Sequence, residues 1–270
     1  MRYTGIQPQY FPRLHYFARI LNTDVFVIRD DVQFVAKHKY PDGQTGWSYQ
    51  VHTPIKTGSG MYYLRVPVTH GSREHRIVDI VPTYDQTWVE DHLRTIEFAY
   101  RKSPFFTVLN SDLHELLHHQ SGSVAELNIR TILWGIARIL ELPLKSDQLT
   151  VESIEAALAD KGTFRLRKIK QGIHIGSGIS PDHSASEKIV ALIKAVGATE
   201  DYCGGTSVLA YLDKGSMKKN DIRMTVQDWT CREYPQLFSS KQPFIPNLSI
   251  IDLLMNVSPK EAREVLASND

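Results

Sequence analysis

The most regular pattern of reactive side chains in this chain is His114-Glu115-Leu116-Leu117-His118, which matches H-E-x-x-H. On a helix, two histidines four residues apart share a face and can bind zinc, with the glutamate as general base. The chain has 11 histidines, so a chance match is easily made, and no third ligand follows at the spacing of known zinc proteases. A zinc site at His114 and His118 is one hypothesis, and an exposed histidine-rich helix face is its alternative.

Two adjacent carboxylates, Asp30 and Asp31, follow the apolar run Val25-Phe26-Val27-Ile28. Adjacent carboxylates raise each other's pKa, so one of the pair can act as a general base or bind magnesium. In the alternative interpretation, one aspartate caps a turn and the other is solvated. His15, in the loop and helix before this run, is the candidate acid or base of the same site.

A second group of candidate residues lies at Tyr202-Cys203-Gly204-Gly205. Two adjacent glycines let the backbone approach a ligand closely, which makes Gly204, Gly205 and the neighbouring Tyr202 candidates for substrate binding. The pattern is not a P-loop, because the spaced Gly-Lys-Ser/Thr is absent. Cys203 is either a nucleophile or a small packed residue, and a lone cysteine is more often packed.

The first 34 residues predict the element that positions these groups. Tyr3 to Gln7 reads as a strand, Pro12 suits the first turn of a helix, and Asp24 to Asp30 reads as a strand that is covered on both faces. Strand, helix and strand in this order form a βαβ unit with a parallel pair. Ligands of such units bind outside the carboxyl ends of the strands. The polar residues expected there, as candidate substrate contacts, are Gln7, Tyr10, Tyr16 and Gln33.

The rest of the chain predicts an α/β protein. A hairpin is expected with strands at 47–53 and 61–69, and further strands at 77–81, 173–175 and 222–226. Amphipathic spacing predicts helices at 85–103, 105–119, 123–140, 149–160 and 184–196, with Ser123 and Glu126 in a capping box. We expect one Rossmann-like parallel sheet, with 1–84 as its N-terminal half, 85–145 as an inserted helical block and 146–270 as its C-terminal half.

Composition excludes several classes of protein. The chain has 270 residues, is 42% hydrophobic and 23% charged, and carries a net charge of +1. These values are ordinary for a globular protein and show no footprint for nucleic acid or an acidic membrane. Two cysteines do not make a disulfide framework, and no apolar run is long enough to span a membrane. We expect a cytoplasmic protein with a small-molecule substrate; the sequence leaves its oligomeric state open.

The segment Pro246 to Met255 predicts a buried C-terminal helix, with Asn247 or Ser249 as its N-cap. Ile250, Ile251, Leu253 and Leu254 leave that helix almost no polar face. Because an unpaired buried carboxylate is costly, Asp252 should pair with a basic group or a backbone N–H near residues 6–34; the alternative is that Asp252 lies on an exposed edge. The candidate partners are Arg13, His15 and Lys37, which would place Asp252 among the substrate-binding residues.

Several segments together resemble the WbqC-like family. They lie between residues 6 and 256 and so span nearly the whole chain. The most specific ones stand at its two ends. These are Gln7-Pro8-x-Tyr10-x-Pro12 with Tyr16-Phe17, Asp24-Val25-Phe26-Val27, Asp30-Asp31-Val32-Gln33-Phe34, Ala99-Tyr100-x-Lys102-Ser103-Pro104, Tyr234-Pro235-Gln236 and Pro246-Asn247-Leu248-Ser249-Ile250-Ile251-Asp252.

This resemblance implies a biosynthetic enzyme of polysaccharide or natural-product pathways, acting on an activated sugar or a similar amine. The reaction expected is acyl or aminoacyl transfer, or ATP-dependent amide formation, with ATP and Mg²⁺ or an acyl-CoA as candidate cofactors. A non-catalytic binding protein of a biosynthetic complex is a further alternative. At the level of fold alone, the opening of the chain is also similar to nucleotidylyltransferases such as pantothenate synthetase.

Overall fold

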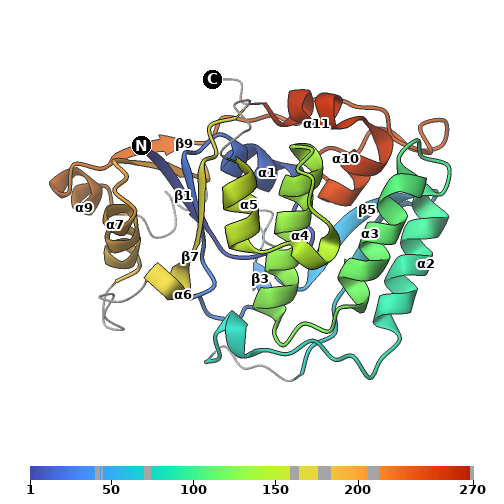
Figure 1. The fold of residues 1–270 in the computed structure, drawn as a ribbon, viewed down its shortest axis with the longest axis horizontal. Coiled ribbons are helices and arrows are strands. Elements are labelled where there is room, and N and C mark those ends of the chain that lie inside the picture. The colour runs from blue at the N-terminus through green and yellow to red at the C-terminus, as the bar shows by residue number, and fades with distance from the viewer. Residues whose placement is uncertain are drawn as a thin grey trace.

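The computed structural model describes residues 1–39, 43, 45–69, 74–158, 164–175, 184–205 and 213–267. Its centre is a five-stranded sheet in which every neighbouring pair is parallel (Figure 1). The strand order across the sheet is β7-β2-β1-β8-β9. The strands are β1 (Arg2–Ile6), β2 (Val25–Ile28), β7 (Lys168–Gln171), β8 (Glu200–Cys203) and β9 (Arg223–Val226).

The predicted N-terminal βαβ unit is present. Helix α1 (Leu14–Leu21) connects β1 to β2, and the two strands pair in parallel from Tyr3 beside Val25 to Ile6 beside Ile28. All four residues of β2 are buried, as expected for a strand covered on both faces. Since β1 and β2 run in the same direction, their carboxyl ends open at one edge of the sheet.

The chain changes direction across the sheet between β7 and β8. Strands β2 and β7 are added on one side of β1, and β8 and β9 are then added on its other side. The prediction of a parallel α/β sheet is confirmed. The strand β8 was not predicted, because its sequence begins with Glu200 and Asp201, and two adjacent carboxylates rarely mark a buried strand.

Helices cover both faces of the sheet (Figure 1). On one face α7 (Ala185–Ala195) and α9 (Lys214–Lys219) pack over a small cluster with Tyr3, Val25 and Val27. The other face carries the main hydrophobic cluster, to which α1 also belongs. The other helices of that cluster are α4 (Val124–Ile139), α5 (Val151–Leu158), α10 (Ile250–Asn256) and α11 (Pro259–Leu266).

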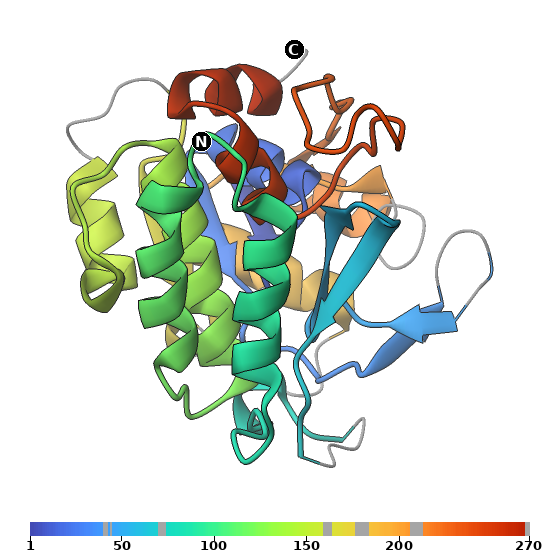
Figure 2. The same ribbon diagram turned by 90° about the vertical axis from the view of Figure 1, so that its right-hand side faces the viewer.

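Two further helices and two hairpins lie beside this layer (Figure 2). Helices α2 (Trp88–Tyr100) and α3 (Phe106–His118) contribute to the main hydrophobic cluster together with α1 and α10. The division into an inserted helical block and two flanking halves stays a prediction. The hairpins are β3 (Lys37–Lys39) with β4 (Thr45–Trp47), and β5 (His52–Thr57) with β6 (Gly60–Arg65).

Some predicted boundaries are wrong for physical reasons. The turn at Gly58 is where the sequence places it, but the strands flanking it occupy 52–57 and 60–65, because 47 belongs to the other hairpin. Residues 77–79 form a short 3-10 helix, η1 (Ile77–Asp79), closed by the bond from Arg76 to Asp79. Residues 173–175 belong to a helical turn, α6 (Gly172–Ile175), and the strand ends before them.

Predicted helix ends are confirmed where a serine caps the first turn. The side chains of Ser123, Ser184 and Ser249 each accept a backbone N–H of their own helix, α4, α7 and α10. Ser249, rather than Asn247, is therefore the N-cap of α10. The carboxylate of Glu126 accepts the N–H of Gly122 in place of the reciprocal bond of a capping box. A further 3-10 turn, η2 (Ser146–Gln148), precedes α5.

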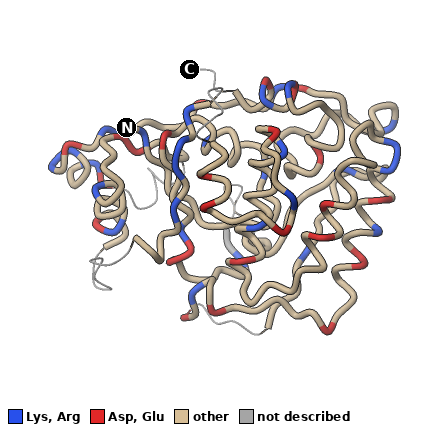
Figure 3. The backbone as a smooth tube through the Cα atoms, in the orientation of Figure 1, with Lys and Arg blue, Asp and Glu red and all other residues tan. Residues whose placement is uncertain are grey.

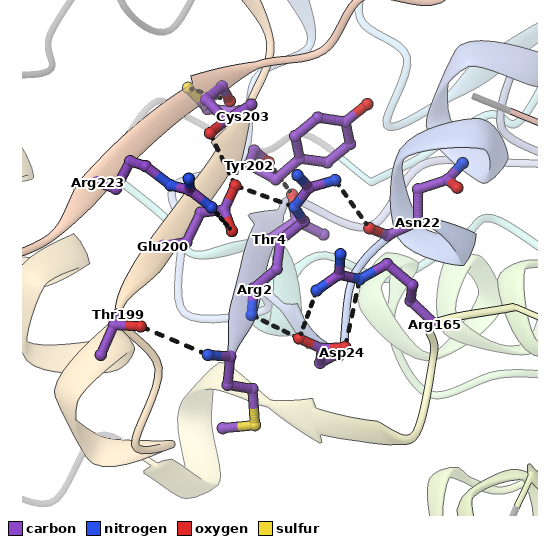
Figure 4. A network of polar contacts seen from close by, with 12 residues as sticks. Arg2, Thr4, Asn22, Asp24, Arg165, Thr199, Glu200, Tyr202, Cys203 and Arg223 are labelled. Carbon is purple, nitrogen blue, oxygen red and sulfur yellow. Dashed lines mark hydrogen bonds and ion pairs between the residues drawn. The ribbon is translucent and has the colours of Figure 1, made fainter. Parts of the chain in front are cut away.

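An ionic network joins the strands at their amino ends (Figure 4). The Glu200 carboxylate accepts from Arg2 at 3.1 Å, from Arg223 at 2.8 Å and from Thr225 at 2.7 Å. These bonds, with burial opposing them, lower the pKa of Glu200 to about 2. Asp24 similarly accepts the N–H of Arg2 at 2.7 Å. The network therefore ties β1, β8 and β9 together at the edge opposite to the candidate site.

Charge is spread over the whole fold. Lysine and arginine mix with aspartate and glutamate along the chain (Figure 3). Within the described part of the chain, no helix has the length and apolar character needed to cross a bilayer.

Candidate functional site at the carboxyl edge of the sheet

The carboxyl ends of the five parallel strands bring together segments that are far apart in the sequence. The loop 7–13 follows β1, Asp30 and Asp31 follow β2, and Gly172 follows β7. On the other side of β1, Gly204 follows β8 and Gln227 follows β9. Most of the residues expected to bind or react from the sequence therefore belong to this edge, where parallel α/β proteins bind ligands.

The loop after β1 is held in an unusual conformation by its neighbours. Phe11 has a φ of +37°, in a region that bulky residues rarely adopt. Its N–H donates to Thr131 Oγ1 on α4, and its carbonyl accepts from Thr53 and Ser249. These bonds hold strained backbone in place at the entrance to α1, as is frequent at functional sites.

Asp30 is a buried carboxylate at the end of β2. Only 1% of the residue is exposed, and its oxygens accept the N–H of Ile173 at 2.9 Å and Gln171 Nε2 at 3.2 Å. Burial raises the pKa of Asp30, and the bond from the Ile173 N–H and the charge of His174 act in the opposite direction. Both hydrogen-bond partners are neutral, so the carboxylate forms no ion pair among the described residues.

Asp30 lines a cavity of about 310 Å³, called here the Asp30 cavity, which lies between β2, β7 and the first turns of α4. Its volume is at the lower end of the range for small-molecule sites. A second cavity of about 700 Å³, between α5 and α6, shares Val151, Glu152 and Gln171 with it. The polar side chains lining the Asp30 cavity are Asp30, Ser123, Glu126, Arg130, Thr150, Glu152 and Gln171.

Asp31 has a different environment from Asp30. Arg29 binds both of its oxygens, with Nε 2.7 Å from Oδ1 and Nη2 2.8 Å from Oδ2. A side chain on Gly172 would come within 2.5 Å of the same carboxylate. The two adjacent aspartates therefore have separate environments: Asp31 holds Arg29 and the start of α6, and Asp30 faces the cavity.

His15 is positioned as a neutral base at the start of α1. Its backbone N–H and its Nδ1 both face Asn247 Oδ1, at 3.0 and 3.1 Å. A backbone N–H can only donate, so the atom facing it must be the amide oxygen, and Nδ1 must then carry its hydrogen. Burial first, and then the charge of Arg19, lower the pKa of His15 from 6.5 to about 4. At neutral pH the lone pair of His15 is therefore on Nε2.

Two arginines flank His15. Arg13, immediately before α1, lies over the ring of Tyr49 at 5.2 Å, and its Nε is buried without a hydrogen-bond partner. Arg19, one turn into α1, donates from Nε to Gln227 Oε1 at 2.8 Å. Its guanidinium would be 2.6 Å from a side chain on Gly204, which explains the glycine at the end of β8. Positive charge thus gathers where the strand order reverses between β1 and β8.

Asp201 was missed from the sequence. It lies on β8, is 4% exposed, and burial raises its pKa to about 6 while Arg19 opposes this shift. The signal was available, since a carboxylate two residues before a buried cysteine on a strand must share its face. Burial, with Asp201 nearby, also raises the pKa of Cys203 to about 12. Cys203 is therefore a packed thiol, not an activated nucleophile.

Several predicted substrate contacts are placed away from solvent. Tyr10 is fully buried, and its hydroxyl lies 3.0 Å from Nδ1 of the buried His92, so its role in substrate binding stays a prediction. Tyr16 is also buried and donates to the carbonyl of Gln7 at 3.3 Å. Tyr202 is buried under the guanidinium of Arg2, on the side of the amino-end network (Figure 4).

Gln7 and Gln33 lie at the rim of the site. Gln7 Oε1 accepts from Gln50 Nε2 at 3.0 Å, and the same amide lies 3.4 Å from the carbonyl of Gln33. Gln33 is exposed, and so is Gly205, which follows the end of β8. Binding of substrate by these three residues stays a prediction.

Asp252 is buried, as predicted, but its predicted partners are wrong. The carboxylate is fully buried and accepts from the hydroxyls of Tyr100 and Tyr234, both at 2.7 Å, and from Gln236 Nε2 at 3.1 Å. None of Arg13, His15 and Lys37 bonds to it. The basic group nearby is the buried Lys56, which donates to Gln236 Oε1 at 3.1 Å. Hairpin β5–β6 supplies this lysine, and the hydrophobic pattern of the sequence could not predict that this hairpin packs next to Asp252.

The two histidines of the H-E-x-x-H pattern lie on the exposed side of α3 with their rings stacked, 5.7 Å apart. His118 donates from Nδ1 to the carbonyl of His114 and from Nε2 to Glu90, and these two bonds raise its pKa. Within the described ranges, no group of three histidine, cysteine, aspartate or glutamate side chains could hold a metal ion. The geometry matches the alternative interpretation, a histidine-rich helix face.

Three groups of the edge were not predicted as site residues and are supplied by other elements. Arg130 is a polar residue on the otherwise largely buried helix α4, which was a usable signal. Gln171 ends β7, which the sequence placed too late. Asn247 belongs to a predicted turn, and its φ of +55° turns the side chain toward His15.

The fold and its polar carboxyl edge define a parallel α/β protein whose candidate site is assembled from both ends of the chain. The model of the WbqC-like protein family matches residues 7–264. The chain belongs to this family. It is also 27% identical to the uncharacterized protein Rv1507c of Mycobacterium tuberculosis (strain ATCC 25618 / H37Rv) over 254 residues, covering 93% of this chain and 92% of that protein. No solved structure gives a significant match.

Proposed function

We propose that this protein is a biosynthetic enzyme that transfers an acyl or aminoacyl group to the amine of an amino sugar or a related metabolite. The observation that carries the proposal is the neutral His15, whose Nδ1–H is held by Asn247 and whose Nε2 has no hydrogen bond among the described residues. A base of this kind can take a proton from an attacking amine at neutral pH.

The chemistry follows from the groups around His15. As the amine nitrogen forms its bond to the acyl carbon, His15 Nε2 accepts the amine proton, and the bond from the acyl carbon to the leaving group breaks. Arg13 and Arg19 supply positive charge beside the base, which suits a carbonyl oxygen gaining negative charge or the phosphates of a donor. An acyl-CoA and an acyl adenylate formed from ATP both carry such phosphates.

The arrangement of the sheet also supports a nucleotide-containing donor. Numbered along the chain, the strand order is 3-2-1-4-5, the order of doubly wound sheets that bind nucleotides where the order reverses. In this chain the reversal lies between β1 and β8, beside Arg19 and Gly204. We therefore propose a Rossmann-like site there, and the nucleotidylyltransferase likeness remains an analogy of fold.

Isothermal titration calorimetry with ATP, an acyl-CoA and a nucleotide sugar tests this proposal first. Binding of at least one donor is expected. Replacing His15 with Gln should then lower kcat by about 10²-fold or more while donor binding persists, because a general base acts in the chemical step. The exposed His119→Gln variant is the matched control. If none of the three compounds binds, both the transferase and the ligase forms of the proposal fail.

A non-catalytic binding protein is the second candidate, and the packing of Tyr10 favours it. That side chain was expected to contact substrate, yet it is fully buried and bonded to His92. A binding protein would retain a ligand but show no turnover with any donor and amine acceptor, and His15→Gln would then affect affinity alone.

A further inference from the structure

The Asp30 cavity is lined by a basic group that forms no ion pair among the described residues. Arg130, on the second turn of α4, donates from Nη2 to the carbonyl of Ser146 at 3.2 Å. Its Nε is buried and has no hydrogen-bond partner, and the carboxylates of Glu126 and Asp147 act on it by charge alone, without an ion pair among the described residues. A buried guanidinium N–H without a partner is costly, and an anionic ligand would satisfy it.

The same cavity is lined by an acidic group that forms no ion pair among the described residues, although the charge of His174 acts on it. Asp30 is held on β2 by one backbone N–H and one side-chain amide, from Ile173 and Gln171. Each carboxylate oxygen can accept more than one hydrogen bond, so this fixed carboxylate retains capacity for a further donor. An ammonium group of a ligand would supply both the donor and the missing positive charge.

We propose that the Asp30 cavity binds a compact metabolite that carries both an amine and an anionic group, with the amine at Asp30 and the anion at Arg130. The adjoining cavity beside α5 and α6 leaves room for a larger substituent. The binding of this ligand does not depend on the proposed function, because His15 does not line the Asp30 cavity and an amine held as an ammonium ion is not the nucleophile of the transfer. Phosphate and carboxylate are both compatible with Arg130, and the choice between them is made by experiment.

Two pairs of probes, each differing only by amine against hydroxyl, separate these contributions in calorimetry. Glucosamine 6-phosphate with glucose 6-phosphate tests a phosphate, and alanine with lactate tests a carboxylate. The amine member of one pair should bind about tenfold tighter than its hydroxyl partner, and the pair that binds identifies the anion. Binding of neither amine probe at about 10 mM would overturn the proposal.

Variants then assign the two ends of the ligand. Arg130→Gln should weaken binding of both members of the pair about tenfold or more, Arg130→Lys should restore part of the loss, and the exposed Arg94→Gln should bind as the wild type. Asp30→Asn should remove the preference for the amine. Unchanged binding by Arg130→Gln, or an unchanged amine preference in Asp30→Asn, contradicts the assignment. Thermal melts check that each variant is folded. If Arg130→Gln does not fold, the binding measured with Arg130→Lys tests the assignment of the anion to Arg130.

The His15→Gln variant separates this inference from the proposed function. It should bind the amine probe as the wild type does, even if it forms no product. Probe binding without turnover in the wild type would leave the binding site established and remove the transfer reaction. Turnover that neither Arg130→Gln nor Asp30→Asn changes, with no change in probe binding, would support the transfer reaction and remove the proposed binding site.

Discussion

At the scale of single residues, burial decides what each candidate side chain can do. His15 and Asp30 follow neighbouring strands, His15 half-buried and Asp30 fully buried, and burial favours the neutral form of each. For His15 this leaves a lone pair at neutral pH, which suits a base. For Asp30 it raises the pKa, which makes an ammonium ligand favourable because the ligand restores the charged form.

The Asp252 network gives a prediction at this scale. Replacing Asp252 with Asn should destabilise the protein by about 2–4 kcal/mol, because it leaves the buried Lys56 without a compensating charge and disturbs the bonds to Tyr100 and Tyr234. Urea denaturation of both proteins measures the difference. Adding Lys56→Met to the variant should recover part of the loss, since the two groups are coupled. A loss below about 0.5 kcal/mol would show that the carboxylate is not charged in the native state.

At the scale of elements, the sequence predicted what is local and missed what depends on distant partners. The alternation and spacing of apolar residues were enough for β1, α1, β2, α4, α7 and α10, and serine caps marked several of their first residues. The environment of Asp31 depends on Gly172, which is distant in the chain. The partners of Asp252 depend on the hairpin β5–β6, whose register cannot be predicted from its own hydrophobic pattern. Strand β8 was not predicted, because Glu200 and Asp201 are unusual residues for a strand that is buried in a sheet.

The junction of β7 and α6 gives a prediction at this scale. Replacing Gly172 with Ala should cost about 1–3 kcal/mol, because the new methyl would lie 2.5 Å from Asp31 Oδ1 and 3.2 Å from the carbonyl of Ile28. Chemical denaturation gives the stability. The exposed Gly58→Ala variant, whose methyl meets the ring of Phe238 at an ordinary 3.5 Å, is the control. Equal stability of the two variants would mean that α6 can shift without loss.

At the scale of the whole molecule, buried titratable groups set the pH dependence of stability. Burial lowers the pKa of His92, like that of His15, from 6.5 to about 4, so the unfolded chain binds more protons than the native protein between these values. Stability from the two histidines is therefore lost as the pH falls from 6.5 to 4. Burial raises the pKa of Asp201 to about 6, so its contribution has the opposite sign in the same window.

Each of the two histidines should lower the free energy of unfolding by about 1.4 kcal/mol for each pH unit between 6 and 4, and the buried Asp30, Asp201 and Asp252, whose pKa values are raised, oppose this loss. Denaturation at a series of pH values measures the net slope. Relative to the wild type, Asp201→Asn should increase the loss of stability on acidification, and His92→Gln should reduce it. A slope that neither variant changes would mean that these groups have ordinary pKa values in the native protein.

The position of β1 in the middle of the sheet has a consequence for synthesis of the chain on the ribosome. Arg2 pairs beside Glu200, and the N–H of Leu14 donates to the carbonyl of Leu248. Strand β1 thus keeps one edge unpaired until Glu200 has been made, and the start of α1 waits until Leu248 has been made. An unpaired apolar strand edge invites wrong pairing, so the nascent chain is a natural client for chaperones that shield such edges.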